Sequence, residues 1–434
     1  MTAALLRNDF PLISPPPDFT RMISALKYRA NTGKLLERGV CMWQFWGGFI
    51  LLTYTGINIF TGIRLLGLFR YFFPSIKSVV FWPLYILVCY SYIFSFFLRF
   101  GWMQPLRHAA VYTLPALVYF FFSLLLLEGT RLVLRFTNPT LLSPLFTAAG
   151  TGIALGLALL VMVYGSFHAR DIKTAYYSIT INKDISGHLG QAEGLRIALI
   201  SDLHMGATVE RKWTARMVDA VNKTNPDMVC ITGDIFDNDP ENLRDPEGIA
   251  AELRRLNAPL GVYACPGNHD VDRVSLSSLR EGTTQNHIKD FLKKANIVFL
   301  QDEVELAAGC LYLAGRKDSR PIGISEERKS AAELSAGLDK SKPLIILDHQ
   351  PVDFPNEDKA GADLVLSGHT HKGQFFPGNI ATAGIYRSSG AIHYGHWQGN
   401  TAQIIVSSGV GVWGPPIRIA TDSEVAVVDI KFSN

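Results

Sequence analysis

Aspartate, asparagine and histidine side chains recur in five short blocks of this 434-residue chain, each directly after a short apolar run. They offer carboxylate oxygens, amide oxygens and imidazole nitrogens but no thiolate, a set of ligands that suits manganese, iron or zinc. A lone Asp after a strand is more often a helix cap, and a lone His a hydrogen-bonded core residue. Five such blocks in series predict a metal site instead. In chain order the blocks are Asp202-Leu203-His204, Gly233-Asp234, Gly267-Asn268-His269-Asp270, Asp348-His349 and Gly368-His369-Thr370-His371.

The spacing within the blocks indicates how their side chains would hold an ion. Asp202 and His204 are two residues apart, as are His369 and His371, so on extended backbone each pair points to one side. A carboxylate such as that of Asp234 can bridge two cations roughly 3.5 to 4 Å apart, the spacing of two-metal sites that act on phosphoryl groups. The blocks are therefore compatible with two neighbouring cations.

The apolar runs ahead of the blocks predict the buried strands that position them. Helix-like spacing over 212–223 and 249–256 lies between these runs, and such alternation is typical of a sheet with helices on its faces and ligand chemistry at the strand ends. Two later runs, 402–407 and 424–430, are expected to close a second sheet and complete four layers. The five strands expected ahead of the blocks are 195–200, 228–232, 261–264, 344–347 and 364–366.

The first 168 residues have a different character from the rest of the chain. Charged residues make up only 18% of the whole sequence, against roughly 25% in an ordinary soluble protein. Four stretches approach the roughly 20 apolar residues that cross a bilayer, and each is apolar all round with Arg, Trp or Tyr at its flanks, which favours membrane spans over core helices. These stretches are 40–62, 78–98, 109–127 and 145–166. The domains expected are a tail over 1–39, a four-helix membrane domain over 40–168 and an α/β domain over 177–434.

Charge distribution sets the expected orientation and partners. Lys and Arg near the ends of the four stretches place both termini in the cytoplasm, although a count wrong by one span would move the C-terminal domain across the membrane. The net charge of +3, from 41 basic and 38 acidic residues, gives no support to a nucleic-acid partner.

Two further expectations concern single residues. Glu128 and Arg131 are expected to pair on one helix face, the alternative being a proton or ion path. Cys265 is expected to be a small buried residue rather than a ligand.

The five blocks together resemble the calcineurin-like metallophosphoesterase superfamily, whose pattern is D-x-H, GD, GNH(D/E), H and GHxH. The resemblance covers roughly residues 190–434 and implies a four-layer αββα sandwich with two divalent cations, manganese first, with iron or zinc as alternatives. It also implies that the imidazole of His269 assists the leaving oxygen and that Asp270 holds the tautomer of that ring. One cation would be held by Asp202, His204, Asp234 and His371, and the other by Asp234, Asn268, His349 and His369.

Finer features are similar to a membrane-associated bacterial branch of this superfamily, which includes enzymes similar to a UDP-2,3-diacylglucosamine pyrophosphatase of lipid A synthesis. The features are the stretch 368–374, the turn 408–411, Pro416 with Arg418, and the helices ahead of the domain. They imply a multi-pass protein of the bacterial inner membrane with a cytoplasmic catalytic domain, membrane lipids as partners and a phosphorylated, lipid-linked substrate. Two alternatives stay open: an anchored hydrolase of soluble nucleotides or phosphomonoesters, and a transporter or scaffold with a regulatory C-terminal domain.

Residues that would contact substrate are harder to assign. Basic side chains between the blocks could bind phosphate, although for any one of them an ordinary solvated surface is the better expectation. His393, His396 and Trp397 form a Gly-bounded loop that could contact substrate or be a packed turn. The basic residues considered are Arg273, Arg280, Arg316, Lys317, Arg320 and Arg328.

Overall fold

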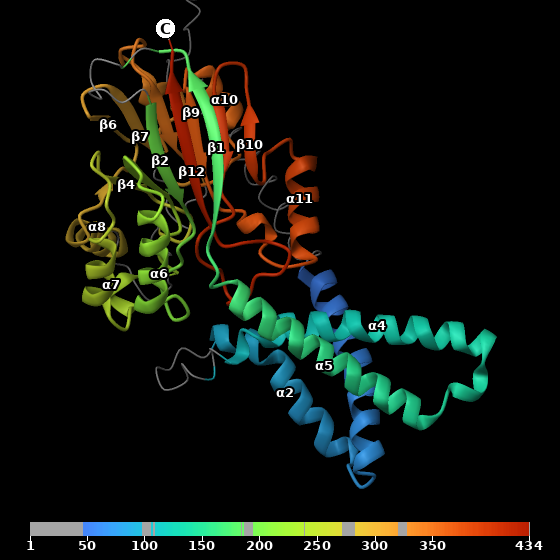
Figure 1. Cartoon of the computed structure of the whole chain (residues 1–434). Coiled ribbons are helices and arrows are strands. Elements are labelled where there is room, and N and C mark those ends of the chain that lie inside the picture. Colours follow the sequence, from blue (N-terminus) through green and yellow to red (C-terminus); the bar gives the residue numbers. More distant parts are fainter. Residues whose placement is uncertain are drawn as a thin grey trace, which may run out of the picture.

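The computed structural model of the chain describes residues 47–97, 106, 109–183, 185, 194–237, 239–270, 283–319 and 328–433. The expected tail over 1–39 lies outside these residues. Figure 1 shows two parts within them, a group of long helices and an α/β domain that follows it in the chain.

Four apolar helices correspond to the four predicted stretches. By length and composition, three of the helices in the described part of the chain are able to cross a membrane. The second contains Pro83, and its described apolar portion, Ser78–Phe94, is shorter than a span requires, so the count of four is not confirmed. The four helices are Gly47–Phe72, α2 (Ser78–Phe97), α4 (Thr113–Thr137) and α5 (Pro144–His168).

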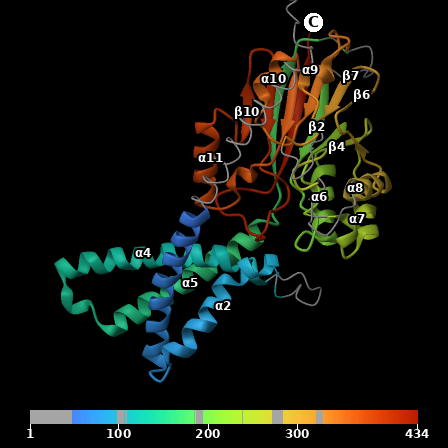
Figure 2. The same cartoon turned by 180° about the vertical axis from the view of Figure 1, so that it is seen from behind.

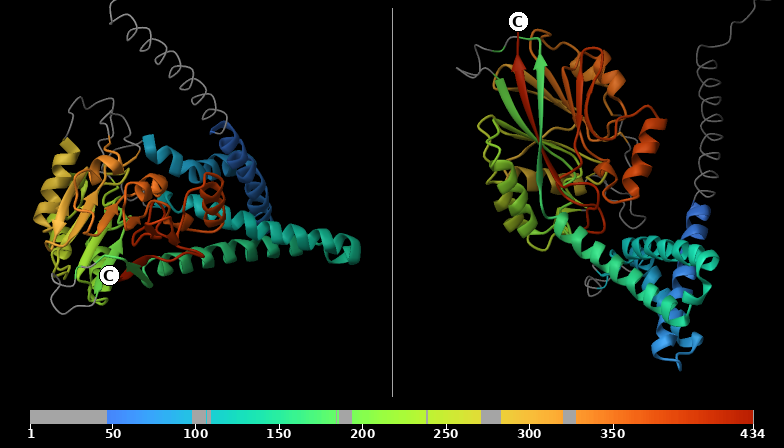
Figure 3. Two further views of the ribbon diagram at one scale, coloured as in Figure 1. Left: turned by 90° about the horizontal axis from the view of Figure 1, so that it is seen from above. Right: turned by 45° about the vertical axis from the view of Figure 1, so that its right-hand side comes forward.

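The first and third helices run past their predicted ends because charged residues near those ends neutralise one another. Arg64 Nη2 lies 2.6 Å from Glu128 Oε1, and Arg131 Nη1 lies 3.8 Å from the same oxygen. The expected pairing of Glu128 with Arg131 is therefore present, but the closer partner lies on another helix. Helices α4 and α5 are joined through η2 (Pro139–Leu141) and form a hairpin that projects away from the α/β domain in both views of Figure 3.

The α/β domain contains two six-stranded sheets. Strands β2, β3, β4, β8, β9 and β11 lie within about two residues of the predicted runs. The first sheet has the order β1 (Lys173–Ile181), β12 (Glu424–Phe432), β2 (Gly194–Ile200), β3 (Met228–Thr232), β4 (Val262–Cys265) and β5 (Val298–Phe299). The second has the order β10 (Gly395–Gln398), β11 (Gln403–Val406), β9 (Leu364–Ser367), β8 (Leu344–Leu347), β7 (Leu311–Gly315) and β6 (Glu303–Ala307).

Alternating side chains build the layers around these sheets. Leu199 and Cys230 of the first sheet pack against Ile345 of the second in a core between the sheets. Ile200 faces the other way and packs in a core that includes Trp213. Ile346 of the second sheet packs in a third core with Ala331 and Phe354, so helices cover the outer face of each sheet in the expected helix–sheet–sheet–helix order. Helices α6 (Arg211–Asn222), α7 (Pro246–Leu253) and α8 (Thr283–Lys294) lie in sequence among the strands of the first sheet, and α9 (Ala331–Ser335) and α10 (Phe354–Lys359) among those of the second.

The expectation that 424–430 closes the second sheet is wrong. Strand β12 lies in the first sheet, between β1 and β2. Its partner β1 begins at Lys173, ahead of the expected domain start at residue 177. Half-exposed strand β1 carries too few buried positions to be recognised by its pattern, and strand pairing between the two ends of the domain is a long-range property.

The strand register places the predicted metal-binding edge on the side of the helices. Strand β1 runs parallel to β12, with Lys173 opposite Glu424, and β12 runs antiparallel to β2, with Ala426 opposite Leu199. The start of β1 and the end of β2 therefore lie at the same edge of the sheet. Because α5 ends at His168, five residues before Lys173, the block after β2 faces the helical part of the protein.

One buried carboxylate fixes a loop of the second sheet. Asp358, only 6% exposed, accepts hydrogen bonds from the backbone N–H groups of Asn400, Thr401 and Ala402 at 2.8 to 2.9 Å. Burial by itself raises the pKa of this carboxyl, but these donors outweigh it and hold the pKa well below its ordinary range.

We expect Asp358→Ala to lower the free energy of unfolding of the α/β domain by roughly 2 to 4 kcal/mol, because buried N–H donors lose their acceptor. The folded state lowers the pKa of Asp358. The contribution of this carboxylate to the free energy of unfolding is therefore complete above the ordinary pKa of about 3.9 and declines as the pH falls below that value. Denaturation midpoints at neutral pH and at acidic pH measure both effects. Asp290→Ala, at an exposed position on α8, is the matched control. Equal midpoints for the two variants would contradict the prediction.

Candidate dinuclear metal site

The five blocks meet where the strands of the two sheets end. The block after β2 is joined to the block after β3 by backbone hydrogen bonds, from Asp202 N to Gly233 O at 3.0 Å and from His204 N to Asp234 O at 2.9 Å. From the second sheet, the backbone N–H of His369 donates to both carboxylate oxygens of Asp202 at 3.0 and 3.1 Å. These bonds bring side chains that are up to 170 residues apart in sequence into one buried cluster.

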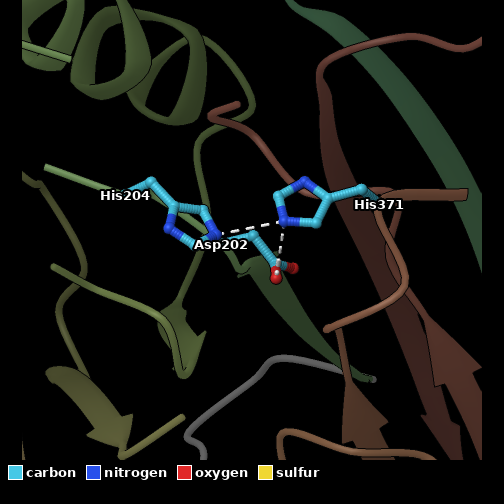
Figure 4. A group of neighbouring side chains, drawn as sticks. All are labelled: Asp202, His204 and His371. Carbon is cyan, nitrogen blue, oxygen red and sulfur yellow. Dashed lines mark hydrogen bonds and ion pairs between the residues drawn. The ribbon is translucent and has the colours of Figure 1, made fainter. Parts of the chain in front are cut away.

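Three of the predicted ligands form a first group, drawn in Figure 4. Asp202 and His204 follow β2, and His371 begins the short helix η4 (His371–Gly373) after β9. All three are buried. His371 Nε2 lies 3.3 Å from Asp202 Oδ1 and 3.1 Å from His204 Nε2, so three ligand atoms converge on one point.

A second group lies beside the first. His349 Nε2 lies 3.3 Å from Asp234 Oδ2, 3.2 Å from His369 Nδ1 and 3.1 Å from Asn268 Oδ1. Asp234 Oδ2 is also 3.6 Å from His204 Nε2, which belongs to the first group. The Asp234 carboxylate therefore lies between the two groups, in the position that a bridging ligand requires.

The surroundings of the imidazoles fit metal ligation. The outer nitrogen of His204 contacts Asp237, with Nδ1 2.9 Å from Oδ1, and that of His349 contacts the backbone, with Nδ1 2.9 Å from Thr232 O. A partner on the outer nitrogen fixes the ring and leaves Nε2 as the lone-pair donor toward the cluster. The donor set of buried and half-buried carboxylate, amide and imidazole groups thus suits two divalent cations, one in each group.

Backbone strain is concentrated at these ligands. Five of the seven predicted ligands have positive φ, a conformation that residues other than glycine rarely adopt. Gly267 is required for a different reason, because a Cβ there would lie 2.2 Å from Asp234 N. Such strain, held in place by the surrounding fold, is typical of functional sites. The φ values are 54° for Asp202, 49° for His204, 49° for Asp234, 71° for His369 and 48° for His371.

The protonation equilibria of the cluster are strongly perturbed. Burial lowers the pKa of His371 well below its ordinary value, and the neighbouring His204 and Arg418 lower it further. Burial also acts to lower the pKa of His349, but the carboxylates of Asp234 and Asp202 outweigh it and leave that pKa well above its ordinary value. Large pKa shifts of opposite sign in neighbouring buried histidines are characteristic of active sites.

His269 lies beside the first group. Its backbone N–H donates to Asp234 Oδ1 at 2.8 Å, and its ring stands edge-on to that of His204 with centroids 4.9 Å apart. The Asp270 carboxylate accepts from the backbone N–H groups of Ile235, Phe236 and Gly267 at 2.9 to 3.0 Å, a loop-fixing role that sequence reasoning did not foresee. Burial, together with the Asp234 carboxylate, raises the pKa of Asp270 to about 7. The tautomer-holding role of Asp270 stays a prediction.

Two further residues support the cluster. Asp237, which contacts His204, was missed, although an acidic residue three positions after Asp234 is a signal that could have been considered. From the sequence, Arg418 was indicated only as one of the features similar to the membrane-associated bacterial branch. Its buried guanidinium donates to His371 O at 3.3 Å, and a second amino group donates to the carbonyls of Ser408, Gly409 and Gly411 at 2.8 to 2.9 Å. Arg418 thereby connects the His371 loop to the turn over 408–411.

Because Asp237 orients a predicted ligand, we expect Asp237→Ala to raise the manganese concentration needed for half-maximal turnover by about 10- to 100-fold. Turnover should largely recover at saturating manganese, since the ligand itself remains. A manganese titration of bis-p-nitrophenyl phosphate hydrolysis measures the shift. Asp219→Ala, on the exposed face of α6, is the matched control. A titration midpoint equal to that of the control would show that Asp237 has no such role.

Two of the basic residues considered as phosphate ligands are paired with carboxylates instead of lying on a solvated surface. Arg316 is only 2% exposed and contacts Asp348, Asp353 and Glu357 at 2.8 to 3.0 Å, so it is neither solvated surface nor a phosphate ligand. Arg328 pairs with the same Asp348.

Cys265 is fully buried, as predicted, and burial raises its pKa well above the ordinary value. Outside the described residues lie Arg273, Arg280 and Arg320.

Of the three residues of the Gly-bounded loop, half-buried His393 lies just ahead of β10, and His396 lies on the exposed strand β10 itself, paired with β11. His393 O accepts a hydrogen bond from Thr370 Oγ1 at 2.6 Å, and His396 Nε2 lies 2.9 Å from Gln403 Oε1. Trp397 is exposed.

Known proteins are similar in sequence to this chain. The profile of the calcineurin-like phosphoesterase family matches residues 195–373. An uncharacterized metallophosphoesterase of Campylobacter jejuni is 30% identical over 237 residues, which are 55% of this chain and 59% of that protein. A transmembrane protein with metallophosphoesterase domain of Danio rerio is 31% identical, over 65% of this chain and 62% of that protein. An uncharacterized metallophosphoesterase of Aquifex aeolicus is 31% identical, over 63% of this chain and 98% of that protein.

The chain therefore belongs to the calcineurin-like metallophosphoesterases. It matches only about three fifths of the length of the Campylobacter and Danio relatives. The name of the Danio protein and the three membrane-length helices indicate a membrane-associated member of the family.

Proposed function

We propose that this protein is a membrane-anchored phosphoesterase that uses two divalent cations to hydrolyse a phosphoester or pyrophosphate bond. The observation that carries the proposal is the position of the buried Asp234 carboxylate between two groups of ligand atoms. Two cations at such a site supply a water of lowered pKa and neutralise charge on the phosphoryl oxygens. Manganese is the first candidate, with iron or zinc as alternatives.

The residues of the chain have separate tasks in this proposal. Asp202, His204 and His371 would hold one cation, Asn268, His349 and His369 would hold the other, and Asp234 would contact both. His269, beside the first group, would give a proton to the leaving oxygen and so neutralise the negative charge that develops on it. No covalent intermediate with the protein is required, so we expect inversion of configuration at phosphorus.

We further propose a lipid-linked substrate, such as a UDP-diacylglucosamine, and a multi-pass arrangement in a bacterial inner membrane with the catalytic domain in the cytoplasm. The support is that the block after β2 faces the helical part of the protein, as the strand register requires. Tethering an active site at this edge raises its effective concentration near lipid-borne phosphate. This arrangement requires all four apolar helices to cross the membrane, because only an even number of spans keeps both termini on one side.

Turnover by the full-length protein tests both parts of the proposal. Three substrates are compared in manganese, in detergent and in liposomes: bis-p-nitrophenyl phosphate, p-nitrophenyl phosphate and a UDP-diacylglucosamine-type lipid. Preferential cleavage of the lipid, enhanced in liposomes, is the expected result. Cleavage of the small substrates alone would favour an anchored hydrolase of soluble nucleotides or phosphomonoesters. Absence of metal-dependent turnover on all three would favour a regulatory domain on a transporter or scaffold.

A further inference from the structure

Helix α11 (Gly378–Ser388) has its apolar side chains on the outside. It contains no buried residue, and Ile380 and Ile385 are 63% and 65% exposed. Together with Ala381 and Gly384 they form one stripe at helical spacing, which we call the α11 face. A helix that covers a soluble domain normally turns its polar residues outward, so this face has the wrong polarity for contact with water.

The α11 face continues the apolar surface of the membrane-length helices. Phe376, two residues before α11, accepts a hydrogen bond at its backbone O from Tyr119 Oη of α4 at 2.7 Å. Its ring lies 6.0 Å from that of Phe122, also on α4. Beyond Phe122, α4 exposes Leu125 and Leu126. In Figures 1 and 2, α11 stands along the side of the α/β domain toward which the α4–α5 hairpin projects.

The charge of the segment around α11, residues 369–400, suits contact with the surface of an anionic bilayer. Residues 369–400 contain no Asp or Glu. Arg387 is exposed in the last turn of α11, and Lys372, ahead of the helix, is half-buried with its Nζ 3.8 Å from the ring centroid of Tyr394. Apolar side chains flanked by cations and free of carboxylates are the pattern of helices that lie in the interface of anionic bilayers.

Both ends of the α11 segment are attached to the loop that carries two predicted metal ligands. At the start, the backbone N–H of Gln374 donates to His371 O at 2.8 Å. At the end, His393 O accepts from Thr370 Oγ1 at 2.6 Å, and Thr370 stands between His369 and His371. The segment therefore holds a fixed position relative to the metal site.

We propose that the α11 face lies in the interfacial layer of a phospholipid bilayer and holds the metal site against the membrane surface. The occupant is lipid rather than protein, because the face is continuous with the surface of helix α4 and lies in a segment without carboxylates. The consequence for substrate, that a phosphate on a lipid headgroup reaches the metal site from the bilayer, rests on the proposed function.

Fluorescence quenching in vesicles tests the contact with lipid. Full-length protein in a Cys41→Ser background carries one introduced cysteine, Ile380→Cys or Ile385→Cys, labelled with an environment-sensitive dye. The vesicles contain phosphatidylcholine and phosphatidylglycerol with a fraction of spin-labelled lipid. Leu306→Cys is the matched control, because this leucine is also apolar and 43% exposed but lies on β6, at the opposite edge of the second sheet from β10.

Several-fold stronger quenching at both α11 positions than at 306 is the expected result. Quenching no greater than at 306 would overturn the proposal. Low quenching at the α11 positions that rises when the protein is diluted would assign the face to a second copy of the chain. Low quenching that rises when residues 1–46 are removed would assign it to that segment.

A second measurement concerns substrate. The double variant Ile380→Ser/Ile385→Ser should lower the ratio of turnover on the lipid substrate to turnover on bis-p-nitrophenyl phosphate by at least about tenfold, because two aliphatic side chains leave the interface. An unchanged ratio would overturn the link to substrate. Failure of the wild type to cleave any of the three substrates would instead contradict the proposed function, while the quenching result would still decide the contact with lipid.

Discussion

The Asp234→Asn variant is expected to hydrolyse bis-p-nitrophenyl phosphate about a thousandfold or more slowly than the wild type, since a cation site contributes several kcal/mol to the transition state. Asp234 Oδ2 lies 3.3 Å from His349 Nε2 and 3.6 Å from His204 Nε2, so one oxygen serves both groups of ligands. An amide in its place is neutral and a poor bridging ligand. We expect the bound metal to fall below two ions per chain.

Metal content measured by mass spectrometry and turnover measured on the same samples test this prediction. Asp219→Asn, an identical substitution on the exposed face of α6, is the control and should keep both metal and turnover. Full metal content with near-normal turnover in Asp234→Asn would contradict the bridging position.

The second large effect is expected for His269→Ala, which should lower turnover by about 10² to 10⁴ without loss of metal, because general acid catalysis contributes factors of that size. The ring of His269 packs against the ring of His204, and its ligand atom lies within 4.8 Å of those of His204 and Asp237, but His269 is not one of the seven predicted ligands. The loss should be smaller for p-nitrophenyl esters than for alkyl esters, since a good leaving group needs less help from an acid.

Metal analysis and the two leaving groups together separate this role from a structural one. His168→Ala, on α5, is a matched control because it removes an imidazole that contacts Asp422 outside the metal cluster. Loss of metal in His269→Ala, or an equal loss of turnover on both esters, would show that His269 is not the acid.

The site was largely predictable from sequence because its residues follow buried strands directly. Runs such as 228–232 are recognisable by composition alone, and the polar residue that follows a parallel strand can only lie at one edge of the sheet. The role of Asp237 was not predictable in this way. Its contact with His204 depends on how the loops after β2 and β3 pack together, which no local pattern encodes.

Long-range pairing explains the other errors. Strand β12 was recognised as a strand but assigned to the wrong sheet, since its partners β1 and β2 lie some 230 to 250 residues earlier in the chain. Arg316 was expected on a solvated surface because arginine usually is, whereas Asp348, Asp353 and Glu357 allow it to be buried. The ends of the first and third apolar helices were misjudged for the same reason, because Arg64 and Glu128 pair across them.

Metal stoichiometry coupled to turnover tests the central claim most directly. Purified full-length protein is stripped with a chelator, titrated with manganese and assayed on bis-p-nitrophenyl phosphate at each step. The account predicts two tightly bound ions per chain, with turnover absent in the stripped protein and restored as the sites fill. Turnover that is indifferent to the chelator, or saturation without bound manganese, would contradict a dinuclear metal site at the ends of β2, β3, β4, β8 and β9.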